Sequence, residues 1–435
     1  MNNVVALSPM DREEAATPRR KIAVALALFF MTRPFQDLLI VGGVDIQLLL
    51  IALIVLFLAI TIVGEIPRFL WFLTRDKLLL LLLALVPLSL LWSVVPLRSL
   101  LGLVNFGAGT FVGIYLAMRF SLRQQLQIVA WALALAAIIS LVIGFVSPPL
   151  GRMFLADGSL AWKGVYEHKN SLGRYMAILG AAAWALTLER KQWGRWVGGF
   201  LLALLLIVLA SSATPLLALA VMVGALPLLG VFRWRDAGIR LISLLLLLLA
   251  VWTLLVLLLH PALSPFADYG LALLGRDPDR NTLLVRFDLW EYAWGYIAQR
   301  PILGYGFDAF WSLPGRRDVI TYVGRVWNVQ QAHNGFIELW LQLGLIGLSG
   351  MVSHLFINMR RILRAATWLT VAEFAWAAGY VVVLAVLNTS YSALLGQLTV
   401  PWSLYVAVTL SVCARLTHSR GLEASPSAGK LNNSL

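Results

Sequence analysis

The strongest constraint on this chain is a succession of long apolar runs. They are about 18 to 22 residues long, the length that a helix needs to cross the hydrocarbon core of a membrane. Sixty per cent of the 435 residues are apolar and 13% are charged, whereas a soluble domain carries roughly a quarter charged residues. The sequence therefore predicts an all-α integral membrane protein.

The candidate transmembrane helices number about twelve. They cover residues 22–41, 45–63, 78–96, 100–118, 126–146, 171–188, 196–210, 214–232, 241–260, 334–358, 371–390 and 392–414. No polar stretch is long enough for a second globular domain. We predict a cytoplasmic tail at 1–21, a single membrane domain at 22–414, and a disordered cytoplasmic tail at 415–435.

Charges between the apolar runs indicate the orientation. If the N-terminus is cytoplasmic, every inner loop is basic, as the positive-inside rule requires. These loops hold Arg68, Arg75 and Lys77; Arg119 and Arg123; Arg190, Lys191 and Arg195; Arg233, Arg235 and Arg240; and Arg360, Arg361 and Arg364. Because the basic residues are scattered in short clusters, the net charge of +13 does not indicate a nucleic-acid partner.

Two longer segments, 147–170 and 261–332, then lie outside the cytoplasm, and we expect the function there. The inner loops are too short for a nucleotide-sugar-binding unit, since one such unit takes roughly 30 residues. An activated donor would therefore have to arrive through the lipid bilayer.

The outer segment 261–332 contains seven arginines and no lysine. They are Arg276, Arg280, Arg286, Arg300, Arg316, Arg317 and Arg325. A guanidinium holds phosphate oxygens bidentately and stays charged near a low-dielectric surface, so the cluster suits a pyrophosphate or another polyanion. The alternative is that these arginines pair with the seven acidic residues of the same segment.

An interfacial helix is predicted directly after Arg286. Phe287, Trp290, Trp294 and Ile297 recur at three- and four-residue spacing, and the other face is polar. Arg286 would open this helix at the level of the lipid headgroups, where free backbone N–H groups could also meet a phosphate. A packing helix with tryptophan anchors is the alternative.

Two histidines stand at the outer ends of predicted helices. His333 precedes Asn334, and His168 precedes Lys169 and Asn170, with each asparagine at the expected N-cap. A histidine that is neutral near pH 7 can take a proton from a sugar hydroxyl as its oxygen attacks an anomeric carbon. A single interfacial histidine is more often a satisfied polar residue.

Neither a metal nor a cofactor is predicted. The single cysteine, Cys413, lies in the last apolar run, which excludes a disulfide framework and a cysteine-based metal site. Asp277-Pro-Asp279 is similar to the Asp-x-Asp motif that holds a nucleotide-bound metal, but it lies between Arg276 and Arg280 and lacks a third ligand. Arg33 and Asp37, four residues apart in the first span, are expected to neutralise each other.

Several stretches resemble a known family. These are Arg300–Phe310 (RPILGYGFDAF), Ala332–Gly347 (AHNGFIELWLQLGLIG) and Glu167–Gly173 (EHKNSLG), with Gly275-Arg-Asp277 and Arg286 preceding Leu289-Trp290. Their order and their loop positions resemble the O-antigen ligase and Wzy-type polymerase superfamily, especially its exopolysaccharide-polymerase (ExoQ-like) branch.

The resemblance implies an enzyme with a fold related to the lipid-dependent, GT-C-type glycosyltransferases. It implies a metal-independent, inverting transfer of an undecaprenyl-pyrophosphate-linked glycan to an acceptor glycan, in the bacterial inner membrane with the active site facing the periplasm. His333 would match the proposed base and Arg286 the pyrophosphate-binding arginine. The other residues that we predict to bind substrate are Arg276, Arg280, His168, Lys169, Arg174, Tyr305, Asp308 and Arg325.

One stretch departs from the family pattern. Relatives usually carry Ser-x-Ser-(Arg/Lys)-Thr between spans seven and eight, whereas this chain has Ala210-Ser-Ser-Ala-Thr214, with Ala213 in the basic position. Either another cation has taken over the role, for which Arg174 is a candidate, or the activity is altered.

Three functions remain open at this point. A polymerase that joins lipid-linked repeat units is the leading hypothesis, and a ligase that moves finished glycan onto lipid A core uses the same donor. A secondary transporter or flippase could have as many spans, but transporters place charged, broken helices near the midplane in matched halves. Here the ionisable residues concentrate in the outer loops.

Overall fold

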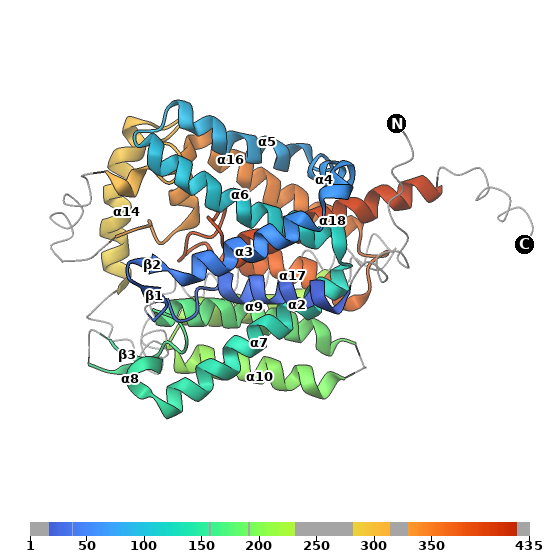
Figure 1. Cartoon of the computed structure of the whole chain (residues 1–435), viewed down its shortest axis with the longest axis horizontal. Helices are drawn as coiled ribbons and strands as arrows, with labels where there is room; N and C mark the ends of the chain where they lie inside the picture. The colour runs from blue at the N-terminus through green and yellow to red at the C-terminus, as the bar shows by residue number, and fades with distance from the viewer. Residues whose placement is uncertain are drawn as a thin grey trace, which may run out of the picture.

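The computed structural model describes residues 17–36, 38–155, 158–189, 192–230, 282–313 and 329–423. These residues are mostly helical (Figure 1). The α-helices are α2 (Pro18–Met31), α3 (Ile46–Ile60), α4 (Ile66–Leu73), α5 (Lys77–Leu88), α6 (Pro96–Arg119), α7 (Leu122–Val146), α8 (Pro148–Gly151), α9 (Lys169–Thr187), α10 (Trp193–Leu209), α11 (Ala213–Gly230), α14 (Thr282–Gln299), α16 (Gly335–Arg364), α17 (Val371–Leu387) and α18 (Val400–Glu423). Short 3₁₀ helices are η1 (Val63–Glu65), η2 (Ser89–Leu91) and η5 (Phe310–Ser312), and two antiparallel hairpins join β1 (Ile40–Val41) to β2 (Val44–Asp45) and β3 (Arg152–Phe154) to β4 (Leu160–Trp162).

Four of the described helices are long and apolar enough to cross a membrane, namely α6, α7, α16 and the first part of α18. α3 and residues 63–73 pass the same test together, although they are bent by 54°. Shorter apolar helices include α5, α10, α11 and α17. A multi-pass membrane protein is therefore confirmed, whereas the count of twelve spans stays a prediction, and the predicted span 241–260 lies outside the described residues.

The first predicted span, 22–41, is too long. α2 ends at Met31, because Arg33 adopts a left-handed conformation with φ of 60° that a helix cannot continue. The chain then turns into the β1–β2 hairpin, and Arg33 forms an ion pair with Asp45, which also caps α3. The expected pairing partner Asp37 lies outside the described residues.

The last predicted span, 392–414, begins and ends elsewhere. α17 stops at Leu387, and the side-chain oxygen of Asn388 accepts the backbone N–H groups of Ala393 and Leu394 at 2.9 and 3.1 Å. This cap stabilises a non-helical segment, so α18 starts only at Val400. α18 then runs to Glu423, past residue 415, where the disordered tail was predicted to begin.

Small residues allow close packing inside the bundle. On α6, Gly109 and Gly113 leave room for α18, and the Ser403 hydroxyl donates to the Gly109 carbonyl at 2.7 Å. The Trp402 indole donates to the Thr110 hydroxyl at 2.9 Å. Small residues that let backbones approach, together with interhelical hydrogen bonds, are the means by which helices associate in lipid.

α16 is broken about a third of the way from its N-terminal end by Gly344, whose φ of 66° and ψ of −167° are not helical. The backbone groups freed by the break are bonded by the loop that follows α14. Tyr305 N–H donates to Leu341 O at 2.8 Å, and Leu345 N–H donates to Pro301 O at 2.8 Å. Unsatisfied backbone groups are costly in a membrane, so the hydrogen bonds from this loop allow the break. They also put two of the sequence stretches that carry the resemblance, 300–310 and 332–347, in direct contact.

Candidate functional site

His333 occupies a constrained position directly before α16. Its φ of 50° lies in the left-handed region that residues other than glycine rarely adopt. Asn334 caps the helix, because its side-chain oxygen accepts the N–H groups of Phe336 and Ile337 at 3.0 and 3.3 Å. The N-cap predicted for Asn334 is thereby confirmed, and the backbone on the helical side of His333 is fixed.

His168 holds the equivalent position before α9, but here the histidine itself is the N-cap. Its Nδ1 accepts the backbone N–H of Asn170 at 3.1 Å, so the N-cap predicted for Asn170 is wrong. Since Nδ1 accepts, a neutral His168 carries its proton on Nε2. The side chain can therefore donate a hydrogen bond from Nε2 to an oxygen of a substrate.

The structure brings His333, Arg286, His168 and Arg174 together, and we call these four residues the outer cluster. Removal from water and then the charges of Arg286, His168 and Arg174 lower the pKa of His333 to about 4. His333 is thus neutral at pH 7, the form that accepts a proton. The members come from α14, α9 and the two segments that precede α9 and α16.

The same positive charge acts on His168. The His168 side chain is partly exposed, but the protein packed around it removes water and so lowers its pKa. The pKa is lowered further by the nearby charges of Lys169, Arg174, Arg286 and Lys163. Cations close to both imidazoles favour binding of an anion between them. Lys169, predicted to bind substrate, is therefore close to the outer cluster.

Arg174, the candidate to replace the basic residue of the motif that departs from the family pattern, is 7% exposed. Its guanidinium stacks 3.3 Å from the centre of the Tyr391 ring and donates to the Ser171 hydroxyl at 2.9 Å. One turn away, Lys169 Nζ donates to the Ser211 carbonyl at 3.3 Å. Lys169 of α9 thus contacts the α10–α11 turn, where Ala213 stands in the position that is basic in the family pattern.

Arg286 lies on α14, the helix predicted for this segment. α14 begins at Thr282, so Arg286 is in its second turn, and the prediction that Arg286 opens the helix beside free N–H groups is wrong. Ile297 is buried, whereas Phe287 and Trp294 are 56% and 48% exposed. The buried side of the helix therefore includes only part of the predicted apolar face.

α14 also holds the His333 loop in place. The Trp290 indole donates to the carbonyl of Ala332 at 2.9 Å. On the other side of the same residue, Ala332 N–H donates to the Glu338 carboxylate at 2.7 Å. Both backbone groups of the residue before His333 are thus bonded by side chains.

Tyr305 and Asp308 belong to the loop that fills the break in α16. The Tyr305 hydroxyl donates to the Tyr296 carbonyl at 3.0 Å, while Asp308 Oδ2 lies 2.8 Å from Arg98 Nε. Burial raises the pKa of Asp308, which the Arg98 charge opposes. These contacts are with the protein itself, so their predicted role in substrate binding stays a prediction. Arg276, Arg280 and Arg325 lie outside the described residues.

Glu338 lies in one of the stretches that carry the resemblance, but no role was predicted for it. It is 6% exposed at the start of α16. Its carboxylate accepts hydrogen bonds from Ala332 N–H, from Trp311 Nε1 at 3.0 Å and from Gln342 Nε2 at 2.7 Å. An acidic residue inside a membrane helix is itself a signal for a functional role.

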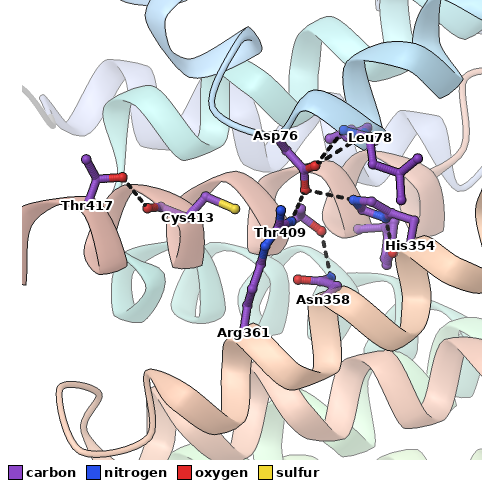
Figure 2. A network of polar contacts seen from close by, with 10 residues as sticks. Asp76, Leu78, His354, Asn358, Arg361, Thr409, Cys413 and Thr417 are labelled. Carbon is purple, nitrogen blue, oxygen red and sulfur yellow. Dashed lines mark hydrogen bonds and ion pairs between the residues drawn. The ribbon is translucent and has the colours of Figure 1, made fainter. Parts of the chain in front are cut away.

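A second buried polar group joins α16 to α5 and α18 (Figure 2). Asp76 Oδ2 accepts from His354 Nε2 at 2.8 Å and from Arg361, and Asp76 Oδ1 caps α5. His354 Nδ1 lies 2.6 Å from the Tyr405 hydroxyl. We call Asp76, His354, Arg361 and Tyr405 the inner network. It was not predicted, because Arg361 was taken only as a loop charge and because 278 residues separate Asp76 from His354.

Potential metal ligands do not gather in the described ranges. Within the part of the chain that the structure describes, no group of three or more histidine, cysteine, aspartate or glutamate side chains could hold a metal ion. Cys413 is a buried free thiol. The Asp277-Pro-Asp279 sequence lies outside the described residues.

The fold defines the class of this protein, and comparison with known proteins adds a family model and a relative. The fold defines a multi-pass helical membrane protein, and residues 198–352 match the family model described as O-Antigen ligase. The chain is 24% identical over 289 residues to the Exopolysaccharide production protein ExoQ of Rhizobium meliloti (strain 1021). The aligned part is 63% of each chain, less than two thirds of the relative. The resemblance to the O-antigen ligase and ExoQ-like family is thereby confirmed.

Proposed function

We propose that this protein is a glycosyltransferase that polymerises repeat units of an exopolysaccharide or another surface glycan. Its donor would be a glycan linked to undecaprenyl pyrophosphate, and its acceptor a sugar hydroxyl of another glycan. The observation that carries the proposal is the outer cluster, in which a neutral His333 lies close to the basic side chains of Arg286 and Arg174. Similarity to an exopolysaccharide production protein favours polymerisation.

The chemistry follows from these charges. The acceptor oxygen attacks the anomeric carbon while its proton passes to His333, and the bond from that carbon to the pyrophosphate oxygen breaks. The leaving pyrophosphate keeps the electron pair of this bond, and the guanidinium groups of Arg286 and Arg174 offset its charge. Attack on the face opposite the leaving group inverts the anomeric configuration. The guanidinium groups can thus neutralise the leaving group without a metal.

His168 would act on the donor rather than on the acceptor proton. Its Nδ1 is engaged by the backbone of α9, so the proton on Nε2 remains to bond a phosphate or sugar oxygen. Lys169 and Arg174 extend the same positive surface. This arrangement supports our view that α9 supplies the cation that Ala213 lacks in the α10–α11 turn.

We place this chemistry at the periplasmic face of the bacterial inner membrane, because the positive-inside rule puts the segments before α9 and α16 outside. Single cysteines introduced at Ser159 and Gly194 provide a test, since both residues are exposed and Cys413 is buried. An impermeant thiol reagent should label the Ser159→Cys protein in intact spheroplasts and label the Gly194→Cys protein only after permeabilisation. The reverse pattern would contradict a lipid-linked donor on the outer face.

A ligase that transfers finished glycan to lipid A core is the second candidate, because the matching family model is described as O-Antigen ligase. One assay separates the two. Purified protein would be mixed with lipid-linked repeat units and, in a parallel reaction, with lipid A core as well. Growth of a long lipid-linked glycan without lipid A core supports the polymerase. A single transfer to lipid A core, with no chain growth, supports the ligase.

A further inference from the structure

We propose that Glu338 is the positioning residue for His333, and that its carboxylate must be a pure hydrogen-bond acceptor to do so. The inference deepens the proposed function, on which its catalytic consequence rests. His333 is held in a left-handed conformation, and a conformation of this kind persists only when neighbouring groups enforce it. Glu338 bonds the backbone N–H of the preceding residue, Ala332.

All described partners of the Glu338 carboxylate are donors. Ala332 N–H and Trp311 Nε1–H can only donate, at 2.7 and 3.0 Å. Gln342 could in principle accept instead, but its Oε1 already accepts the backbone N–H of Asp308 at 3.3 Å, which leaves its Nε2 for Glu338 at 2.7 Å. An amide at position 338 would therefore place one donor against another.

The carboxylate connects the His333 loop to the segment 308–311. Ala332 belongs to the His333 loop, Trp311 to η5, and Gln342 leads to Asp308 in the loop that fills the break in α16. The Trp290 indole of α14 bonds the carbonyl of Ala332, and the Glu338 carboxylate bonds the N–H of the same residue, so both of its backbone groups are held. The position of the imidazole thus depends on a bond that Glu338 makes to the residue directly before His333.

Glu338→Gln is the test, because it preserves size and removes one acceptor. If the introduced amide turns its nitrogen toward Gln342, then Gln342 must reverse, and its own Nε2 then opposes Asp308 N–H. We expect polymer formed by cells that depend on this protein to fall on the order of 10²-fold, the loss that a misplaced catalytic group causes. Binding of undecaprenyl pyrophosphate to the purified full chain should change little, because Arg286 and Arg174 are retained.

The double variant Glu338→Gln, Gln342→Glu should restore activity. The carboxylate introduced at position 342 would accept from the amide nitrogen at position 338 and from Asp308 N–H, while the amide oxygen at position 338 would accept from Ala332 and Trp311. Glu373→Gln is the matched control, since Glu373 is also buried and also accepts a backbone N–H, from Thr370 at 3.0 Å, but it caps α17. This control should leave polymer formation per folded molecule unchanged.

Carbethoxylation of His333, followed by peptide mass spectrometry over a range of pH, separates positioning from loss of fold. Only a neutral imidazole reacts, and the low pKa of His333 keeps it neutral in mild acid. If Glu338→Gln exposes the His333 loop to water, the pH at which half of His333 is carbethoxylated rises. In the double variant this pH should return to that of the unaltered protein. Loss of a negative charge alone would move that pH downward, so a rise reports displacement.

Two results would overturn the proposal: normal polymer formation by the Glu338→Gln protein, or reduced formation with an unmoved modification profile of His333. A parallel His333→Ala protein tests the proposed function independently. If that protein forms polymer normally, His333 is not the base, yet the modification profile still decides whether Glu338 positions it.

Discussion

The outer cluster and the inner network both place a histidine beside an arginine, but they differ in the charged groups that act on the histidine. In the inner network, the Asp76 carboxylate bonds both His354 and Arg361. In the outer cluster, the charged groups that lower the pKa of His333 are Arg286, His168 and Arg174, all of them basic side chains. Buried charge is costly unless it is compensated. The first arrangement places a carboxylate between two basic groups, whereas the second places basic side chains around His333, where we propose that the pyrophosphate binds.

This difference implies opposite roles for His333, directly before α16, and His354, within α16. His354 is fully buried, and both of its ring nitrogens have protein partners, so it holds α16 against α5 and α18. His333 precedes the N-terminal end of the same helix, where its environment suits proton transfer. The break at Gly344 lies between them. The C-terminal part of α16 is anchored to α5 and α18, while the backbone next to the break bonds the 301–305 loop.

The largest expected effect is on chemistry at the outer cluster. His333→Ala should reduce glycan transfer by a factor on the order of 10²–10⁴, the range for loss of a general base. Membrane insertion and binding of undecaprenyl pyrophosphate should persist. The assay is polymer formed per folded molecule, and normal formation would leave His333 an interfacial polar residue and make His168 the next candidate.

His354→Ala is the matched substitution in the inner network. It removes a hydrogen bond to Asp76 and one to Tyr405, so we expect less folded protein in the membrane. Polymer formed per folded molecule should stay close to that of the unaltered protein. Equal losses of specific activity in the two alanine variants would contradict the division into a reactive and a structural histidine.

The next effect concerns the shape of the cation rather than its charge. Arg286→Lys keeps a positive charge but loses the planar fork that can hold two phosphate oxygens. Loss of one charged hydrogen bond costs about 1.5–3 kcal/mol, which corresponds to roughly ten- to hundredfold weaker binding of undecaprenyl pyrophosphate. Activity should fall with the affinity.

Arg361→Lys provides the comparison, because Arg361 pairs with one oxygen of Asp76 and an ammonium can replace that contact. We expect its activity to remain normal. Normal binding by the Arg286→Lys protein would leave Arg286 with a structural pairing role alone.

The sequence predicted some helices better than others, and the reason is physical. Apolar length located α6 and α7 well, because a helix in lipid satisfies its own backbone. It could not locate the ends of α2 and α17, where the chain is stopped by contacts such as the Asn388 cap that depend on tertiary structure. The break at Gly344 was missed for the same reason, since the 301–305 loop supplies its hydrogen bonds.

The two sites show the same limit. His333 and His168 could be linked because both precede a helix that starts on the same predicted side of the membrane. Arg286 could be linked to them through the family resemblance. Asp76 and His354 meet only through the packing of α5 against α16, and nothing in the local pattern around either residue indicates the other.

Acid should affect the outer cluster in a defined direction. The pKa of His333 in the folded protein, about 4, lies below the ordinary value of about 6.5. Between these values the unfolded chain binds the proton and the folded protein does not, so stability contributed by the neutral His333 is full above pH 6.5 and declines as pH falls toward 4.

Bound anion should oppose this shift, because its negative charge offsets Arg286 and Arg174. Adding undecaprenyl pyrophosphate should therefore raise the pH at which half of His333 is carbethoxylated in the purified protein. Arg286→Gln, which removes one of the charges that lower the pKa, should raise that pH without any ligand. A downward shift in either experiment would mean that the positive charge does not act on His333 as proposed.

The smallest expected effect is the loss of one hydroxyl from the inner network. Tyr405→Phe leaves Asp76, His354 and Arg361 in contact and removes only the hydroxyl that lies 2.6 Å from His354 Nδ1. Hydrogen bonds between membrane helices contribute about 0.6 kcal/mol on average and at most about 1.7 kcal/mol, so unfolding in mixed detergent should show a decrease of that order. Transfer activity and the modification profile of His333 should not change, because α16 remains anchored through Asp76. A Tyr405→Phe protein that folds normally but loses activity would show that the inner network acts on the outer cluster through α16, and the charge-balanced network could then no longer be treated as purely structural.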